Sequence, residues 1–305
     1  MESRPFAFSA FAVAALLTAC GVPGPPAGVA SSAVKRESGS SSQTFNYTGA
    51  TQSFYVPTGV TSLQITAIGA GGNGPVDQSG KRTGGPGGLM SATVPVTPTE
   101  DLIVVVGGDT GYNGGGKDGG CRGLCYGHHG AGASDVREGG DGLSNRILVA
   151  GGGGGAGGLC RGTYAEGGIG GGLVGGRGAD GLFQRHGFGG HGGTQVAGGR
   201  SGRGGNFGND HRRSASGYRG SLGYGGPGGD AGDKAGGGGG GGGGYYGGGG
   251  GGGGGHLALH CGGGGAGGGG SSYAEPDATN VVDEPGQGAP PTYNGSVTIS
   301  WDERP

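Results

Sequence analysis

Two glycine motifs in the chain have the spacing of phosphate-binding loops. Residues 69–74 match G-x-G-x-x-G directly after a predicted strand, and residues 111–117 match G-x-x-x-x-G-K. Both chemistries require a helix to follow, yet Pro75 and further glycines follow the first motif. In the second, Asp118 stands where Ser or Thr would hold Mg²⁺. Because glycine supplies 95 of 305 residues, chance matches are expected, and we predict no nucleotide site and no cofactor.

Five cysteines are the next residues that could do chemistry. Cys20 lies near the N-terminus, and the other four are Cys121, Cys125, Cys160 and Cys261. An even number in an exported chain indicates two disulfides, and three pairings are possible. Zinc is the alternative, since four histidines lie close by in sequence: His128, His129, His256 and His260. The spacing matches no compact zinc motif and an oxidising compartment favours disulfides, so we predict no metal.

A third candidate is a sparse arginine–glycine segment with interleaved aromatic residues, a pattern found in proteins that bind nucleic acid. Its members are Arg200, Arg203, Phe207, Arg212, Arg213, Tyr218 and Arg219. A net charge of -2 with 13% charged residues does not favour nucleic acid as a bulk partner. We therefore predict a solvated loop, or contacts to lipid phosphates or acidic glycans, and no nucleic acid partner.

Catalytic side chains cannot be singled out. The sequence offers no recognisable Ser/His/Asp, Cys/His or paired-carboxylate arrangement. We predict that the chain is not an enzyme and has no catalytic residues.

The N-terminus has the pattern of an export signal. Arg4 precedes an apolar stretch over residues 6–19, which is too short for a permanent transmembrane helix. The stretch ends Leu17-Thr18-Ala19-Cys20-Gly21, which resembles the lipobox of bacterial lipoproteins. The resemblance implies a signal peptide over residues 1–19, lipid attached to Cys20, and a membrane as partner through that anchor. Residues 20–43, rich in Gly, Pro, Ala and Ser, are predicted to be a flexible tether in the cell envelope.

Folded structure is predicted from about Thr44 onward, and it is predicted to be all-β. Residues 62–68 alternate apolar and polar side chains, and residues 296–301 do the same. Short strands separated by Gly and Pro indicate an antiparallel sandwich, and no stretch has a helical period. The other predicted strands are residues 52–56, 89–94, 102–106 and 146–149.

The glycines come in runs, including residues 236–244 and 247–255, and not in the G-X-Y period of collagen. The last predicted strand follows residue 149 by about 150 residues, so residues 151–270 form an insertion between strands of one sheet. Extended three-residue-per-turn polyglycine II helices could pack side by side there, because glycine has no Cβ to keep backbones apart. The sequence therefore predicts an ordered bundle and not a linker.

An ordered set of motifs resembles the glycine-rich domain of the anaplastic lymphoma kinase and leukocyte tyrosine kinase ectodomains. The set comprises residues 45–50, 54–57, 68–72, 132–137, 146–155, the run around Tyr245 and Tyr246, and residues 267–273. The resemblance covers residues 44–301. It implies a tumour-necrosis-factor-like antiparallel β-sandwich with a large inserted bundle of polyglycine II helices. The receptors' kinase motifs are missing from this sequence.

These observations predict a lipid-anchored cell-surface module that binds or adheres to an extracellular protein or glycan. Tyr245 and Tyr246, isolated between two nine-glycine runs, are the best candidates for an exposed aromatic anchor, although both rings could instead cover the bundle. The alternative is a purely structural envelope component without a specific ligand. An ice-binding surface would need a regular repeat of small threonine-like residues, and none is visible in the sequence.

Overall fold

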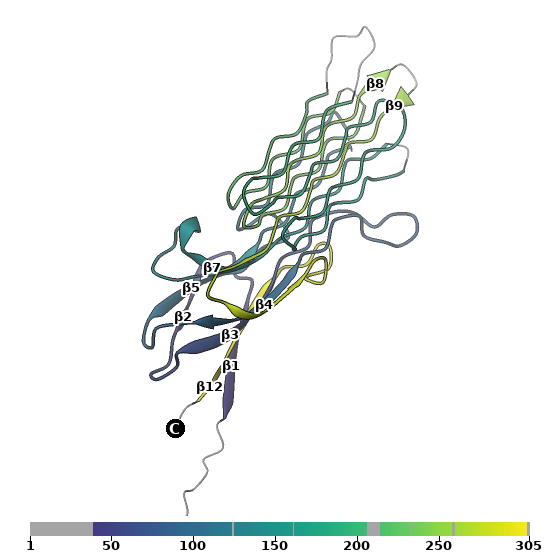
Figure 1. Cartoon of the computed structure of the whole chain (residues 1–305). Helices are drawn as coiled ribbons and strands as arrows, with labels where there is room; N and C mark the ends of the chain where they lie inside the picture. Colours follow the sequence, from purple (N-terminus) through teal and green to yellow (C-terminus); the bar gives the residue numbers. More distant parts are fainter. Residues whose placement is uncertain are drawn as a thin grey trace, which may run out of the picture. The chain divides into compact units, whose positions relative to one another are not determined.

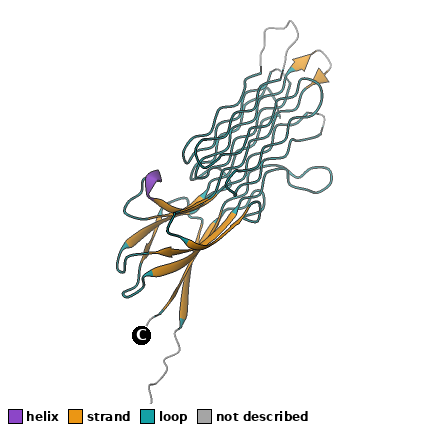
Figure 2. Cartoon of the chain, in the orientation of Figure 1, coloured by secondary structure: helices purple, strands orange, loops and turns teal. Residues whose placement is uncertain are grey.

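The computed structural model describes residues 39–303, apart from 124, 161, 206–213, 233 and 258–259. It is nearly all-β, with two five-stranded antiparallel sheets (Figures 1 and 2). The first sheet has the order β1 (Ser40–Asn46), β12 (Ser296–Asp302), β3 (Ser62–Ile68), β4 (Leu89–Pro95) and β11 (Thr279–Glu284). The second has the order β10 (Tyr273–Ala274), β7 (Arg146–Ala150), β6 (Ser134–Arg137), β5 (Asp101–Val105) and β2 (Gln52–Tyr55).

Two further elements lie outside these sheets. The strands β8 (His256–Leu257) and β9 (His260–Cys261) pair with each other, and one 3-10 turn, η1, spans Leu143–Asn145. No other helix occurs among residues that the structure describes.

Alternation along the strands builds the core between the two sheets. In β3 the side chains of Leu63, Ile65 and Ala67 are fully buried, while the residues between them face outward. β12 contributes Val297 and Ile299 in the same way. The second sheet supplies matching apolar side chains, including Leu102, Val104, Val136 and Leu148. The sandwich-like architecture predicted from alternation is confirmed.

Several strands were not predicted. β1 begins at Ser40, inside the segment predicted as tether, and pairs with β12 from Ser40↔Asp302 to Asn46↔Ser296. Strands β6 and β11 are rich in polar residues and show little apolar alternation, so the sequence did not reveal them. The predicted signal peptide and most of the predicted tether lie outside the described residues.

Three strand connections contribute extended, glycine-rich segments. They join β3 to β4, β5 to β6, and β7 to β10, and Figure 1 shows them running side by side beyond the strands. The longest leaves β7 at Ala150 and returns to β10 at Tyr273, and the two strands pair through Tyr273↔Val149. Both phosphate-loop motifs of the sequence lie in these connections and neither is followed by a helix.

Backbone hydrogen bonds join each glycine segment to several others. In the run 236–244, the N–H groups of Gly239, Gly240 and Gly241 donate to the carbonyls of Gly265, His128 and Gly226, each at 2.9 Å. The carbonyls of the same three glycines accept from Gly251, Gly155 and Gly116, each at 2.8 Å. Successive residues thus bond to six different neighbouring segments, and this run is enclosed on all sides.

Segments that are enclosed by more neighbouring segments contain more glycine. The described glycines of 236–244, 247–255 and 262–270 are buried, and Ala266 is the one non-glycine residue among them. Segments at the outside show a three-residue period in exposure. Exposed side chains occur at Phe188 and His191, at Arg200 and Arg203, and at Tyr224, Pro227 and Asp230, with buried or half-buried residues between them. One side of each outer segment faces solvent, and only there does a side chain fit.

We expect valine at Gly240 or Gly251 to destabilise the protein by about 3 kcal/mol or more, because close-packed interiors resist added volume. A Cβ at Gly240 would lie 2.1 Å from the carbonyl oxygen of Gly116, and one at Gly251 would lie 2.0 Å from that of Gly265. Thermal unfolding and protease resistance measure the effect. Ala215→Val adds bulk at an exposed position of an outer segment and is the control. Wild-type stability in both glycine variants would show that these backbones do not pack closely.

Candidate binding surfaces

Polar side chains from the sandwich hold the ends of the glycine runs. Arg146 opens β7 and is buried, and its guanidinium donates to the carbonyls of Gly244 at 2.8 Å and Tyr245 at 3.0 Å. A third bond, at 2.9 Å, reaches the carbonyl of Leu143. Burial lowers the pKa of Arg146 below its ordinary value, because desolvation disfavours the charged form. The three carbonyl acceptors explain how this cation is accommodated in the interior.

Tyr245 and Tyr246, the predicted aromatic anchor, lie at this junction and are half-buried. The ring of Tyr245 stacks on Tyr273 with centroids 4.1 Å apart and meets Tyr246 edge-on at 5.4 Å. The guanidinium carbon of Arg146 lies 5.3 Å from the Tyr245 centroid, within cation–π range. These contacts give both rings a packing role where the glycine runs meet β7 and β10. A role in ligand binding stays a prediction.

A buried ion pair fixes another connection onto the second sheet. Arg137 donates from Nε to Asp135 at 2.6 Å, and Asn113 donates to the other oxygen of that carboxylate at 2.7 Å. Arg137 also donates to the backbone carbonyl of Asp141. A hollow of about 610 Å³ lies beside this group, with Tyr224 on its rim. The charges are already paired with each other, so we assign them a positioning role for the loop around Asn113.

The outward face of the first sheet is polar and regular. Thr44, Thr298, Thr66 and Ser91 occupy one row across four neighbouring strands. Thr44 bonds Thr298 at 3.0 Å, and Thr66 bonds Ser91 at 2.9 Å. The sequence does not reveal this row, because its members come from four separate strands. The hydroxyls bond to each other within each pair, which reduces what they offer to a ligand.

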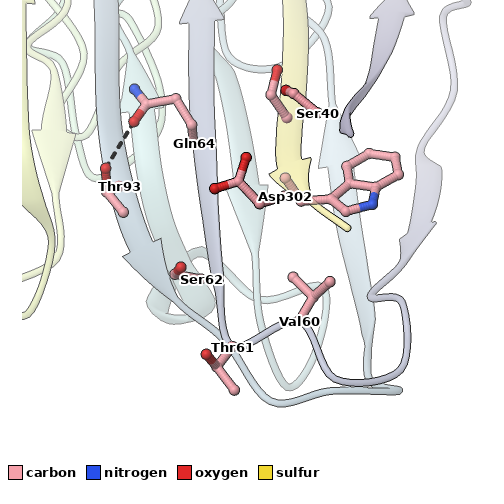
Figure 3. A pocket seen from close by; sticks show the side chains of 9 residues that line it. Ser40, Val60, Thr61, Ser62, Gln64, Thr93 and Asp302 are labelled. Carbon is pink, nitrogen blue, oxygen red and sulfur yellow. Dashed lines mark hydrogen bonds between the residues drawn. The ribbon is translucent and has the colours of Figure 1, made fainter. Parts of the chain in front are cut away.

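A hollow of about 370 Å³ lies at one end of that face (Figure 3). Its lining includes Gln64, Thr93, Trp301 and Asp302, and Thr93 donates to the Gln64 amide oxygen at 2.8 Å. These groups can form hydrogen bonds. Within this lining, no nucleophile has a histidine beside it.

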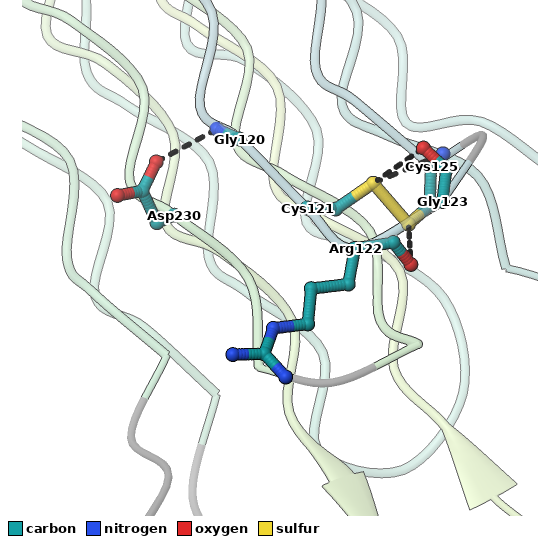
Figure 4. The surroundings of a disulfide bond; sticks show 6 residues. All are labelled: Gly120, Cys121, Arg122, Gly123, Cys125 and Asp230. Carbon is teal, nitrogen blue, oxygen red and sulfur yellow. Dashed lines mark hydrogen bonds between the residues drawn. A yellow bond between two sulfur atoms is a disulfide. The ribbon is translucent and has the colours of Figure 1, made fainter.

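The four remaining cysteines form two disulfides, as predicted, and the structure selects one of the three possible pairings. Cys121 bonds Cys125, and Cys160 bonds Cys261. The first closes the turn between two neighbouring segments, where Gly120 also donates to Asp230 at 2.7 Å (Figure 4). The second ties the first segment after β7 to the last segment before β10. Both reinforce the connections away from the strands.

The zinc alternative finds no support in the described residues. All four cysteines are in disulfides, and the described part of the chain contains no group of three His, Cys, Asp or Glu side chains that could hold a metal ion. His129 Nδ1 lies 3.0 Å from Asp118 Oδ1, and the ring of His128 packs edge-on against that of Tyr164. Burial lowers the pKa of His128.

Three carboxylates meet at one end of the second sheet. Glu100 precedes β5, Glu138 follows β6, and Glu275 follows β10. Burial, a hydrogen bond with Glu100, and the charges of Glu100 and Glu275 raise the pKa of Glu138 to about 7. Burial likewise raises the pKa of Glu275. The cluster makes the ionisation of this end sensitive to pH near neutrality.

The outer glycine segments present an array of exposed side chains. We call this array the outer rows; its members are Val174, Arg177, Phe188, His191, Arg200, Arg203, Tyr218, Arg219, Tyr224, Pro227 and Asp230. Neighbouring segments are joined laterally, for example by the N–H of His191 and the carbonyl of Arg200 at 2.8 Å. The backbone therefore fixes the base of each side chain.

Neither a protein-family model nor a curated protein matches this sequence. Among the residues described, no helix is long and apolar enough to cross a bilayer. Cys20, the predicted lipid attachment residue, lies outside the described residues.

We expect loss of the Cys160–Cys261 disulfide to cost more stability than loss of Cys121–Cys125. The sequence separations are 101 and 4 residues, and the entropy of a cross-linked unfolded chain falls with loop length. The chain-entropy model gives about 4.7 kcal/mol for the long loop and about 2 kcal/mol for the short one. Denaturant unfolding of Cys160→Ser/Cys261→Ser and Cys121→Ser/Cys125→Ser measures both. Equal losses would contradict the loop-length argument.

The raised pKa of Glu138 predicts that the stability of the fold depends on pH. Its folded pKa, about 7, lies above the ordinary value of 4.5, so the folded state binds the proton more tightly. This contribution to stability is complete below pH 4.5 and is lost as pH rises through about 7. Glu138→Gln should flatten the fall of the melting temperature across this window. Glu284→Gln, which removes an exposed carboxylate from β11, is the control. An unchanged profile in Glu138→Gln would refute the assignment.

Proposed function

We propose that the protein is a lipid-anchored binding module of the bacterial cell envelope, displayed for adhesion to an extracellular ligand. The main support for this proposal is the scaffold, in which laterally bonded backbones present the exposed side chains of the outer rows at regular intervals. Such a surface is rigid before binding, which limits the entropy lost on association. The two disulfides are compatible with export to an oxidising compartment.

We infer that the glycine segments are polyglycine II helices packed as a bundle. Successive N–H groups of one run point to three different neighbours, and exposure repeats every third residue, both of which a helix with three residues per turn requires. The two-sheet sandwich with this insertion supports kinship with the glycine-rich domain of the receptor ectodomains and a tumour-necrosis-factor-like topology.

A purely structural envelope component is the second candidate. The extensive backbone bonding and the disulfides favour it equally well. The outer rows favour a ligand, because exposed arginine and aromatic side chains are frequent at binding surfaces. The sequence offers no recognisable catalytic arrangement of side chains, which supports a binding role over an enzymatic one.

Surface display tests the proposal. Expressed in a bacterial host, the chain should incorporate labelled palmitate and confer adhesion to a polysaccharide-coated or protein-coated support. Cys20→Ala should abolish both labelling and adhesion, since the lipid attachment residue is lost. Tyr245→Ala/Tyr246→Ala separates the two roles of these rings: adhesion unchanged at matched surface level leaves them a packing role only. A displayed, folded chain without adhesion on any support would favour the structural alternative.

A further inference from the structure

The outer rows contain a cationic hollow that the proposed function does not by itself explain. A hollow of about 400 Å³ lies over the outer segments, and four of its lining residues are Arg177, His191, Arg200 and Arg219. They come from four segments that follow one another laterally. The hydrogen bonds Gly178 N–Gly190 O, His191 N–Arg200 O and Gly220 N–Gly199 O, at 2.8 to 3.0 Å, join these segments.

The lateral bonds determine which side chains share the hollow. Gly178, which follows Arg177, bonds to Gly190, which precedes His191, so Arg177 and His191 lie level with each other. The backbone N–H of His191 bonds directly to the carbonyl of Arg200. In sequence these residues span 177–219, and a flexible segment of that length would not keep them together. The hollow therefore exists only because the backbones are in register.

Three arginines converge there with little compensating charge. No Asp or Glu lines the hollow. Arg177 is paired with Asp180, which lies on its own segment. Arg219 donates from Nε to the carbonyl of Gly198 at 3.1 Å, which holds its guanidinium over the neighbouring segment. Arg200 is exposed, and the described residues give its side chain no hydrogen bond or ion pair. The hollow is thus a net cationic site with at least one guanidinium available.

The cationic surface continues along the segments. Three residues of a polyglycine II helix advance about 9 Å, so Arg203 and Phe188 form a second level beyond Arg200 and His191. The N–H of Phe188 bonds to the carbonyl of Arg203 at 2.8 Å, which places these two level with each other. Phe188 is 41% exposed, and Tyr218 is 64% exposed on the next segment. Exposed guanidinium groups and aromatic rings thus lie on neighbouring segments, and the Phe188 ring also contacts that of His186, with centroids 5.1 Å apart.

We propose that this surface binds an acidic polysaccharide through its carboxylate groups. Arginine pairs with carboxylates in a bidentate geometry, and aromatic faces accept the apolar side of a sugar ring. The hollow spans four segments, so it fits an extended polymer better than a compact ion. This inference rests on the proposed function and specifies its ligand.

Polygalacturonate is the probe, and the full-length chain in detergent is the protein. Binding to immobilised polygalacturonate should be saturable, should weaken as salt screens the charges, and should be absent on neutral dextran. Arg200→Gln/Arg219→Gln should weaken binding about tenfold or more, since charge-assisted bonds are lost. Arg82→Gln/Lys117→Gln removes the same charge from exposed positions outside the hollow and should bind as wild type. Arg200→Gln alone leaves the Arg219 backbone bond in place, and should weaken binding while leaving the melting temperature unchanged.

Three results of the binding measurements would overturn the inference. They are no saturable binding to polygalacturonate, an equal loss in the control variant, and tighter binding of single-stranded oligo-dT or phosphatidylglycerol vesicles than of polygalacturonate. If the arginine variants keep the adhesion of displaying cells, the polysaccharide assignment fails while the adhesion function stands. If purified protein binds polygalacturonate but displaying cells never adhere, the adhesion function fails and the binding surface remains.

Discussion

The carbonyl oxygens of neighbouring segments approach the buried glycines so closely that no side chain fits between the backbones. A Cβ built on Gly240, Gly251 or Gly267 would lie 1.9 to 2.1 Å from a backbone oxygen of another segment. Real Cβ atoms do not come this near to backbone atoms, so the packing requires glycine at these positions. The composition of the chain follows from this contact. Glycine also loses the most conformational entropy on folding, and the many lateral hydrogen bonds must offset that cost.

The same constraint arranges the segments. A segment enclosed by six others can carry no side chain, which describes residues 236–244 and 247–255. A segment with one solvent side can carry a side chain at every third residue, which describes the rows of Arg200, Arg203 and Tyr224. Scaffold and exposed surface are therefore separate sets of residues in the same segments. Substitutions in the outer rows can change the chemistry of the surface without disturbing the interior.

The buried runs 236–244, 247–255 and 262–270 have no apolar side chain apart from Ala266, so their attachment to the sandwich depends on polar contacts. Arg146 reaches the carbonyls at the end of one run. Ser271 and Ser272, both fully buried, bond to backbone atoms of neighbouring segments in the same β7–β10 connection; the hydroxyl of Ser271 donates to the carbonyl of Thr194 at 2.9 Å. Each of these buried groups has a partner, as an interior requires. The strands hold every connection at the sandwich, and the disulfides reinforce the β5–β6 and β7–β10 connections away from the strands.

The sequence alone determined the elements whose signals are local. Alternation located β3 and β12, the even number of cysteines predicted two disulfides, and the glycine runs predicted backbone packing without side chains. Local signals failed for β1, β6 and β11, whose polar residues become strands because a neighbouring strand supplies their hydrogen bonds. Only the tertiary structure decided the pairing Cys160–Cys261, the serine and threonine row, and the meeting of Arg177, His191 and Arg200. Glycine backbones bond to one another whatever their sequence position, so no local pattern states which segments become neighbours. Which segments become neighbours is determined by the strands at the ends of the connections and by the space available to each run.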